Sequence, residues 1–145
     1  MRTLLAAWQF WALLSAFFAA LTAIFAKVGV EGVNSDFATF VRTLVIICVL
    51  AAILTALGEW QAPTLVTRRT YIFLVLSGLA TGASWVCYFR ALKIGEAARV
   101  APIDKLSVVM VALIGASFLG ERLSLTNWTG VGLIAAGAIL VAYGV

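Results

Sequence analysis

Five long apolar stretches occupy most of this 145-residue chain. They cover residues 5–26, 36–57, 71–92, 100–119 and 128–145. Each has about the 17 to 25 residues that a membrane-spanning helix requires. Backbone groups without partners are not tolerated in hydrocarbon, and the alternation of a transmembrane strand is absent, so each stretch is predicted to be a helix. We therefore expect an all-α, polytopic membrane protein, a five-helix bundle that forms a single domain over residues 1–145.

Composition independently favours a membrane protein. Hydrophobic residues make up 64% of the chain and charged residues 11%, and a soluble domain of this size could not bury so much apolar surface. The loops between the stretches have only about seven to about thirteen residues, which leaves no room for a soluble domain between them. A net charge of +4 is modest for such a chain and gives no reason to expect nucleic acid as a partner.

Signals for helix ends fall between the stretches. Glycines follow four of them and Ser, Thr or Asn precede three, as helix termini prefer. These residues are Gly29, Gly58, Gly95 and Gly120, and Ser35, Thr70 and Asn127. Pro102 falls in the first turn of the expected fourth helix, where the missing backbone donor costs little.

Charged residues lie inside the predicted spans, among them Arg42, Asp104 and Lys105. An ionised side chain near the bilayer centre costs about 2.5 to 3.5 kcal/mol, so a retained one usually faces the bundle interior or water. Arg42 is the deepest, about 9 Å along its helix at about 1.5 Å per residue. For Lys105 the alternative is snorkelling to the nearer surface, and for Asp104 a structural ion pair with Lys105, Arg42 or Arg90. We expect Arg42 to line a site.

Polar and aromatic residues recur at helical spacing on three of the spans, so they share faces that could line a path. The candidate lining residues are Thr81, Ser84, Trp85 and Tyr88 on the third span, Trp11 and Ser15 on the first, and Thr39 beside Arg42 on the second. The alternative is ordinary packing, because Ser and Thr commonly form hydrogen bonds between membrane helices. Three such faces together favour a polar cavity.

The distribution of Lys and Arg does not fix the orientation of the chain. The side that carries the N-terminus has four of these residues (Arg2, Arg68, Arg69 and Arg122), and the opposite side also has four (Lys27, Arg90, Lys93 and Arg99). Either the first helix sets one orientation despite the weak bias, or the protein inserts both ways. The second alternative permits an antiparallel homodimer, because many transporters combine two inverted repeats around a midplane site.

The fifth span has no charge and is rich in small residues. Gly132 and Ala136 are spaced for close helix contact, as are Gly78 and Gly82 on the third span. Each pair fits either a contact within one copy or a seam between two copies. We favour the dimer role for the fifth span.

The order and spacing of several short motifs resemble one EamA repeat of the drug/metabolite transporter superfamily. The resemblance rests on Trp11 with Phe25-Ala26-Lys27, Arg42, Tyr88-Phe89-Arg90-Ala91-Leu92, Ala101-Pro102, Phe118-Leu119-Gly120-Glu121-Arg122, and the glycines at 130 to 137. It covers nearly the whole chain. Proteins of this family commonly contain two inverted repeats, whereas this chain carries one. In this it is similar to the four-span small multidrug resistance transporters, but the first span lacks the acidic residue that couples those proteins to protons.

The resemblance implies a secondary transporter of a small metabolite or drug-like solute, a multi-pass protein of a bacterial inner membrane. Its expected partners are the lipid bilayer, a small-molecule substrate and a second copy of the chain. On this basis Arg42 and Lys105 attract an anionic or zwitterionic group, Asp104 partners them or serves as a coupling carboxylate, and Trp85 and Tyr88 contact the apolar part.

A non-transporting membrane subunit is the competing class, in which the charges only fix helix register. An enzyme is not expected. The chain has no histidine, no nucleotide-binding loop and no catalytic constellation, so we also expect no cofactor and no metal.

Overall fold

The computed structural model describes residues 7–144. Within that range five stretches are helical, long enough and apolar enough to cross a membrane: Trp8–Val30, Ser35–Leu57, Arg68–Ile94, Ala97–Phe118 and Leu125–Tyr143. The all-α, five-span prediction is confirmed. Predicted span ends at Leu5 and Val145, like Arg2 in the charge count, lie outside the described residues. The chain divides into two compact units, one of Met1–Lys27 with Ile94–Val145 and one of Val28–Lys93, called here the first and second units. The single-domain assignment stays a prediction.

The second unit contains α3 (Ser35–Leu57) and α4 (Arg68–Ile94), joined by a loop with the short 3-10 helix η1 (Pro63–Leu65). Asn34 caps α3, its Oδ1 accepting from the backbone N–H groups of Asp36 at 2.8 Å and Phe37 at 3.1 Å. Gly58 ends the helix at φ 67°, a left-handed conformation that suits glycine. Both ends of α3 are therefore fixed by local chemistry.

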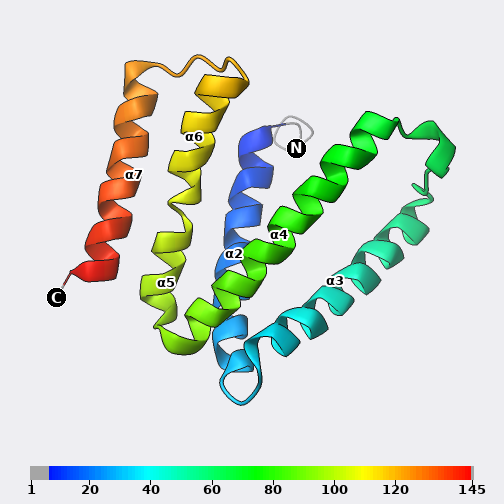
Figure 1. The fold of residues 1–145 in the computed structure, drawn as a ribbon, viewed down its shortest axis with the longest axis horizontal. Coiled ribbons are helices and arrows are strands. Elements are labelled where there is room, and N and C mark those ends of the chain that lie inside the picture. Colours follow the sequence, from blue (N-terminus) through cyan, green and yellow to red (C-terminus); the bar gives the residue numbers. More distant parts are fainter. Residues whose placement is uncertain (1–6, 145) are drawn as a thin grey trace. The chain divides into compact units, whose positions relative to one another are not determined.

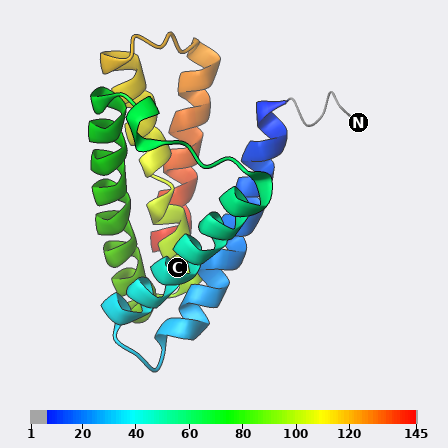
Figure 2. The ribbon, with the colours of Figure 1, turned by 90° about the vertical axis from the view of Figure 1, so that its right-hand side faces the viewer.

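Helices α3 and α4 approach each other where α3 begins and α4 ends, and are farther apart near the loop that joins them (Figures 1 and 2). Close to that junction the Lys93 ammonium donates to the carbonyl of Val33 at 2.7 Å. Val30 and Leu92 are the largest fully buried side chains among the described residues. The best-packed part of the second unit thus lies at one end of its two helices.

The first unit contains most of α2 (Trp8–Val30), together with α5 (Ala97–Asp104), α6 (Ser107–Phe118) and α7 (Leu125–Tyr143). Both α5 and α6 pack against α7. The packed face of α7 carries Val131, Ala135 and Ala138 at helical spacing, and Ala138 is buried. The Lys27 ammonium donates to the carbonyl of Gly95 at 3.0 Å and so ties the end of α2 to the turn before α5.

The fourth span was predicted over residues 100–119, and the structure places it at Ala97–Phe118. It begins earlier, at Ala97, and is broken into α5 and α6 at Lys105 and Leu106. Pro102 consequently lies inside α5, where its missing N–H leaves the carbonyl of Ala98 without its usual helical donor. Across the break the backbone N–H groups donate to the carbonyl three residues earlier instead of four. Leu106 donates to Ile103 at 3.0 Å and Val108 donates to Lys105 at 3.0 Å.

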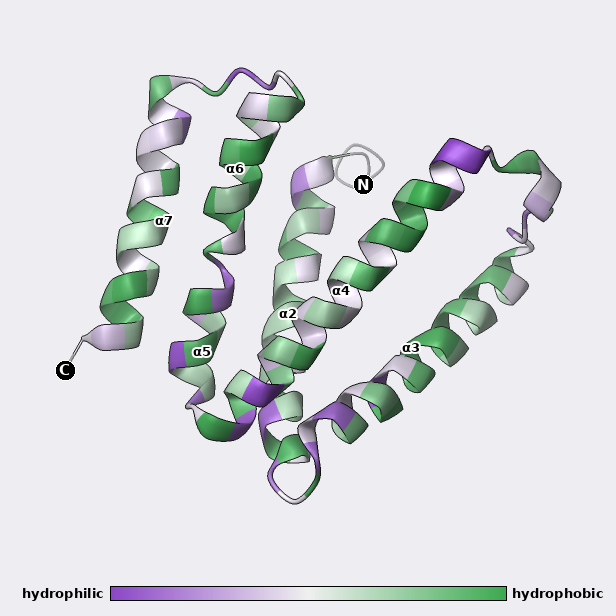
Figure 3. Cartoon of the chain, in the orientation of Figure 1, coloured by the Kyte–Doolittle hydropathy of each residue, from purple (hydrophilic) through white to green (hydrophobic). Residues whose placement is uncertain are grey.

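Large apolar side chains are exposed along every span of the described chain, and Figure 3 shows the green apolar colouring along most of α3. A water-soluble protein rarely leaves such continuous apolar surface uncovered. These surfaces fit contact with lipid tails or with other membrane helices.

Asn34→Ala is expected to destabilise the second unit by about 1 kcal/mol, the usual worth of an N-cap, because two backbone donors lose their acceptor. The measurement is the unfolding free energy in mixed micelles. Asn34→Asp retains the acceptor and is the matched control. Equal losses in the two variants would show that the cap contributes nothing.

Candidate functional site

Arg42 lies in the second unit on α3 and is held against the aromatic side chains of α4. Its Cζ atom is 3.9 Å from the ring centroid of Trp85 and 5.5 Å from that of Phe89. Both distances are within the range of a cation–π interaction, which Arg forms more often than Lys. Arg42 and Trp85 are half-buried, and Phe89 is buried. The structure thus brings together two residues that the sequence analysis had placed on separate faces.

Phe89 was not predicted as a site residue. It lies one helical turn after Trp85 on the same side of α4, at the i, i+4 spacing that places side chains next to each other. That spacing was the available signal. Together Trp85 and Phe89 form an aromatic wall against which the guanidinium rests.

The other predicted residues of α4 surround this wall differently. Tyr88 is half-buried and lies near Arg42, whereas Thr81 and Ser84 are exposed on the described chain. Only the half of the predicted stripe nearer the end of α4 adjoins Arg42.

Thr39 is buried one turn before Arg42, but its hydroxyl serves its own helix. It donates to the carbonyl of Ser35 at 2.9 Å, and Thr43 donates in the same way to the carbonyl of Thr39 at 2.8 Å. Hydroxyls engaged with their own backbone are less available to a ligand. This part of the predicted face fits the packing alternative better.

A second charged contact of the same unit joins the start of α3 to the end of α4. Arg90 donates to Asp36 in a bidentate arrangement, from Nε to Oδ1 at 3.0 Å and from Nη2 to Oδ2 at 2.7 Å. Such fork-to-fork pairs combine charge with fixed geometry. The sequence analysis offered Asp104 as a partner for Arg90; the structure assigns Asp36 instead.

Arg90→Gln is expected to lower the thermal stability of the purified protein more than Arg99→Gln does. Both pairs are exposed, but Arg99 contacts Glu96 through a single oxygen at 3.2 Å within one turn of the chain, and single exposed contacts of that kind contribute little. The Arg90 pair joins two helices through residues that are 54 positions apart in sequence. The double exchange Asp36→Arg with Arg90→Asp should recover part of the loss, as measured by the melting temperature in detergent. A double variant no better than the single one would contradict this role.

Asp104 and Lys105 lie in the first unit, at the break between α5 and α6. Their side chains form an ion pair with Nζ to Oδ2 at 3.1 Å. Asp104 therefore has one of the partners considered for it, and both charges sit where the helix is interrupted. Figure 3 shows hydrophilic colouring between α5 and α6. Trp11 and Ser15, the predicted residues of α2 in the same unit, are exposed.

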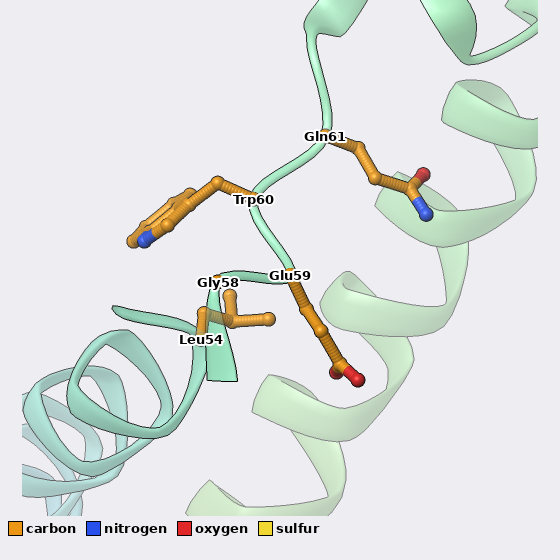
Figure 4. A pocket seen from close by; sticks show the side chains of 5 residues that line it. All are labelled: Leu54, Gly58, Glu59, Trp60 and Gln61. Atoms are coloured by element: carbon orange, nitrogen blue, oxygen red, sulfur yellow. The ribbon is translucent and has the colours of Figure 1, made fainter. Parts of the chain in front are cut away.

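A depression of about 860 Å³ lies at the far end of α3, lined by Leu54, Gly58, Glu59, Trp60 and Gln61 (Figure 4). It contains none of the predicted site residues. The Trp60 indole donates to the Thr55 hydroxyl at 3.1 Å, and its ring points away from the side chains of Glu59 and Gln61 (Figure 4). An exposed tryptophan at a helix end is typical of the membrane interface.

Comparison with known proteins agrees with these features. Residues 6–143 match the EamA-like transporter family. The chain is 70% identical over 135 residues, 93% of its own length and 96% of the relative's, to an "Uncharacterized transporter in cobO 3'region" of Sinorhizobium sp.

A more distant relative is the "Probable 4-amino-4-deoxy-L-arabinose-phosphoundecaprenol flippase subunit ArnE" of Hamiltonella defensa. It is 26% identical over 78 residues, 54% of this chain and 70% of the relative. No solved structure matches the chain. Both relatives carry transporter names and not enzyme names. The chain belongs to the EamA-like transporter family and is an integral, multi-pass membrane transporter.

Proposed function

We propose that this protein is a secondary transporter of a small metabolite or drug-like solute in a bacterial inner membrane, and that two copies enclose its polar cavity. The observation that carries the proposal is Arg42, a charge held within a span by aromatic rings 3.9 and 5.5 Å away. A charge retained at such depth usually serves a polar path. Family membership supplies the transport activity, and both named relatives are bacterial.

Two features favour a second copy. The small residues Gly132 and Ala136 are exposed on α7, away from the face that packs within the protomer. Nothing lies within 4 Å of a Cβ placed at Gly132, Gly78 or Gly82. Surfaces of this kind permit close approach of another membrane helix.

We infer an antiparallel arrangement of the two copies. Apart from Arg42 and Lys105 within the helices, Lys and Arg are divided four to four between the two sides of the predicted topology, so these residues favour neither orientation. An odd number of spans with inverted copies generates the two-fold arrangement of inverted-repeat transporters. Reporter fusions at the C-terminus should then label both sides of the membrane.

In this proposal Arg42 of the second unit attracts the polar part of the solute, while Trp85 and Tyr88 of the same unit contact its apolar part. Thr81 and Ser84 line the entry from the exposed face of α4. In the first unit Asp104 is the ion-pair partner of Lys105 at 3.1 Å. The driving energy comes from a solute or ion gradient.

A second candidate is a subunit that works only with a different membrane partner. The word "subunit" in the name of the more distant relative favours it. In that case the exposed small-residue face of α7 contacts the partner instead of a second copy.

The test is a solute-release screen on the purified chain in metabolite-loaded liposomes, with the number of copies per particle measured first. Transport by a two-copy particle supports the proposal. Absence of flux, together with stoichiometric purification of another membrane protein, would favour the second candidate. A monomeric particle that transports would overturn the shared cavity.

A further inference from the structure

The charge of Arg42 has no acidic counterpart in the second unit. Asp36 is the acidic residue within α3, and both of its oxygens are engaged by Arg90 at 3.0 and 2.7 Å. Over residues 7–144, Arg42 takes part in none of the ion pairs, and its guanidinium donates no hydrogen bond to the protein. A guanidinium in this position retains a net positive charge.

The aromatic contacts hold this charge without neutralising it. A ring centroid 3.9 Å from Cζ occupies one face of the planar guanidinium. The N–H donors of arginine lie in the plane of the group, at its edge, so stacking leaves them available. Trp85 thereby fixes the plane in which a ligand must approach.

This geometry selects among ligand groups. In-plane N–H pairs match the two oxygens of a carboxylate or phosphate, whereas an ammonium group is repelled and a hydroxyl offers only a single weak acceptor. We propose, on the basis of the proposed function, that the transported solute carries a carboxylate or phosphate group. Arg42 binds this group through two N–H donors, and Trp85 is the surface that positions the guanidinium.

The ligand group has two conceivable sources, a water-soluble solute or the phosphate of a lipid headgroup. The chemistry at Arg42 is the same for both. They differ in whether the anion reaches the site from water or from the bilayer, which lipid composition can distinguish.

The experiment uses the full chain in phosphatidylcholine nanodiscs, with Trp8, Trp11, Trp60 and Trp128 changed to Phe so that Trp85 alone reports binding. The probes are benzoate, phenyl phosphate, benzylammonium and benzyl alcohol. We expect one or both anions to bind, and neither the cation nor the alcohol to compete with them. Arg42→Gln should weaken the binding of the anion by about tenfold to about a hundredfold, which is the usual contribution of hydrogen bonds to charged groups.

Arg69→Gln is the matched control. Arg69 also lies near an aromatic ring of the second unit, 5.9 Å from the centroid of Phe73, but at the start of α4. Its loss should leave anion affinity unchanged. Arg42→Lys keeps the charge but not the paired donors, so its affinity for the anion should lie between those of the wild type and Arg42→Gln. Anion binding that survives Arg42→Gln, or stronger binding of benzylammonium, would overturn the inference.

Replacing phosphatidylcholine by phosphatidylglycerol tests the lipid source. If the fluorescence of Trp85 changes with this lipid in the wild type but not in Arg42→Gln, a headgroup binds at Arg42. If the soluble probes bind in phosphatidylcholine, a solute binds there. Either result supports the anion assignment. The outcome also separates the two proposals. Flux of cations with anions excluded would refute this inference and leave transport intact, whereas Arg42-dependent anion binding without flux would refute transport alone.

Discussion

Arg42→Ala is expected to reduce solute flux in liposomes by about 30-fold or more while assembly stays intact. In the proposed site Arg42 pairs with the anionic group of the solute. Removing one member of such a desolvated charge pair costs about 2 to 5 kcal/mol, and each 1.4 kcal/mol is about a factor of ten. The aromatic wall of Trp85 and Phe89 is left without its cation. The measurement is the initial rate of release of whichever solute the wild type transports.

The control for this variant is Arg69→Ala, which removes an equal charge near the ring of Phe73. The number of copies per particle is compared in all three proteins, since a change in assembly would lower flux for a different reason. Wild-type rates in Arg42→Ala would remove Arg42 from the transport path. Equal losses in both variants would point to a general effect of positive charge.

Leu92→Ala is expected to have the largest effect on stability, a loss of about 2 to 5 kcal/mol in the free energy of unfolding. Leu92 is fully buried at the end of α4, and its truncation leaves a cavity in the best-packed part of the second unit. Unfolding in mixed micelles measures the loss.

Leu79→Ala is the matched control on the same helix. Leu79 is 67% exposed, so its truncation should change the unfolding free energy by no more than about 0.5 kcal/mol. If the two variants lose equal stability, the junction of α3 and α4 is not the structural core of this unit.

Span positions were predictable from the sequence because hydrocarbon imposes long apolar runs. The second span was expected over residues 36–57 and is Ser35–Leu57, and the glycine expected to end it, Gly58, has the left-handed conformation that such a role requires. The residues that cap the starts of the helices were predicted less accurately. Asn34 and Ser124 cap α3 and α7, where Ser35 and Asn127 had been expected to precede the helices.

The interruption of the fourth span was not predicted. With a helix beginning at residue 100, Pro102 falls in the first turn; with the observed start at Ala97, it falls inside. Proline disturbs the turn that precedes it, whereas the interruption at Lys105 and Leu106 follows Pro102, so this residue does not mark the break.

Contacts between helices could not be predicted from one sequence. Helical spacing showed which residues share a face, but the register of α3 against α4 depends on packing far along the chain. Arg42 was therefore identified without Trp85 as its neighbour, and Asp36 was not paired with Arg90, 54 residues away.

The interrupted fourth span also affects how the protein meets membranes of different thickness. With 8 and 12 residues, α5 and α6 measure about 12 and about 18 Å, and neither alone crosses a hydrocarbon layer of about 30 Å. We expect the turn at Lys105 and Leu106 to bend as the lipid layer thins and to straighten as it thickens, whereas an unbroken helix tilts as a whole. Lipid chain length should then act on the segment that carries Asp104 and Lys105.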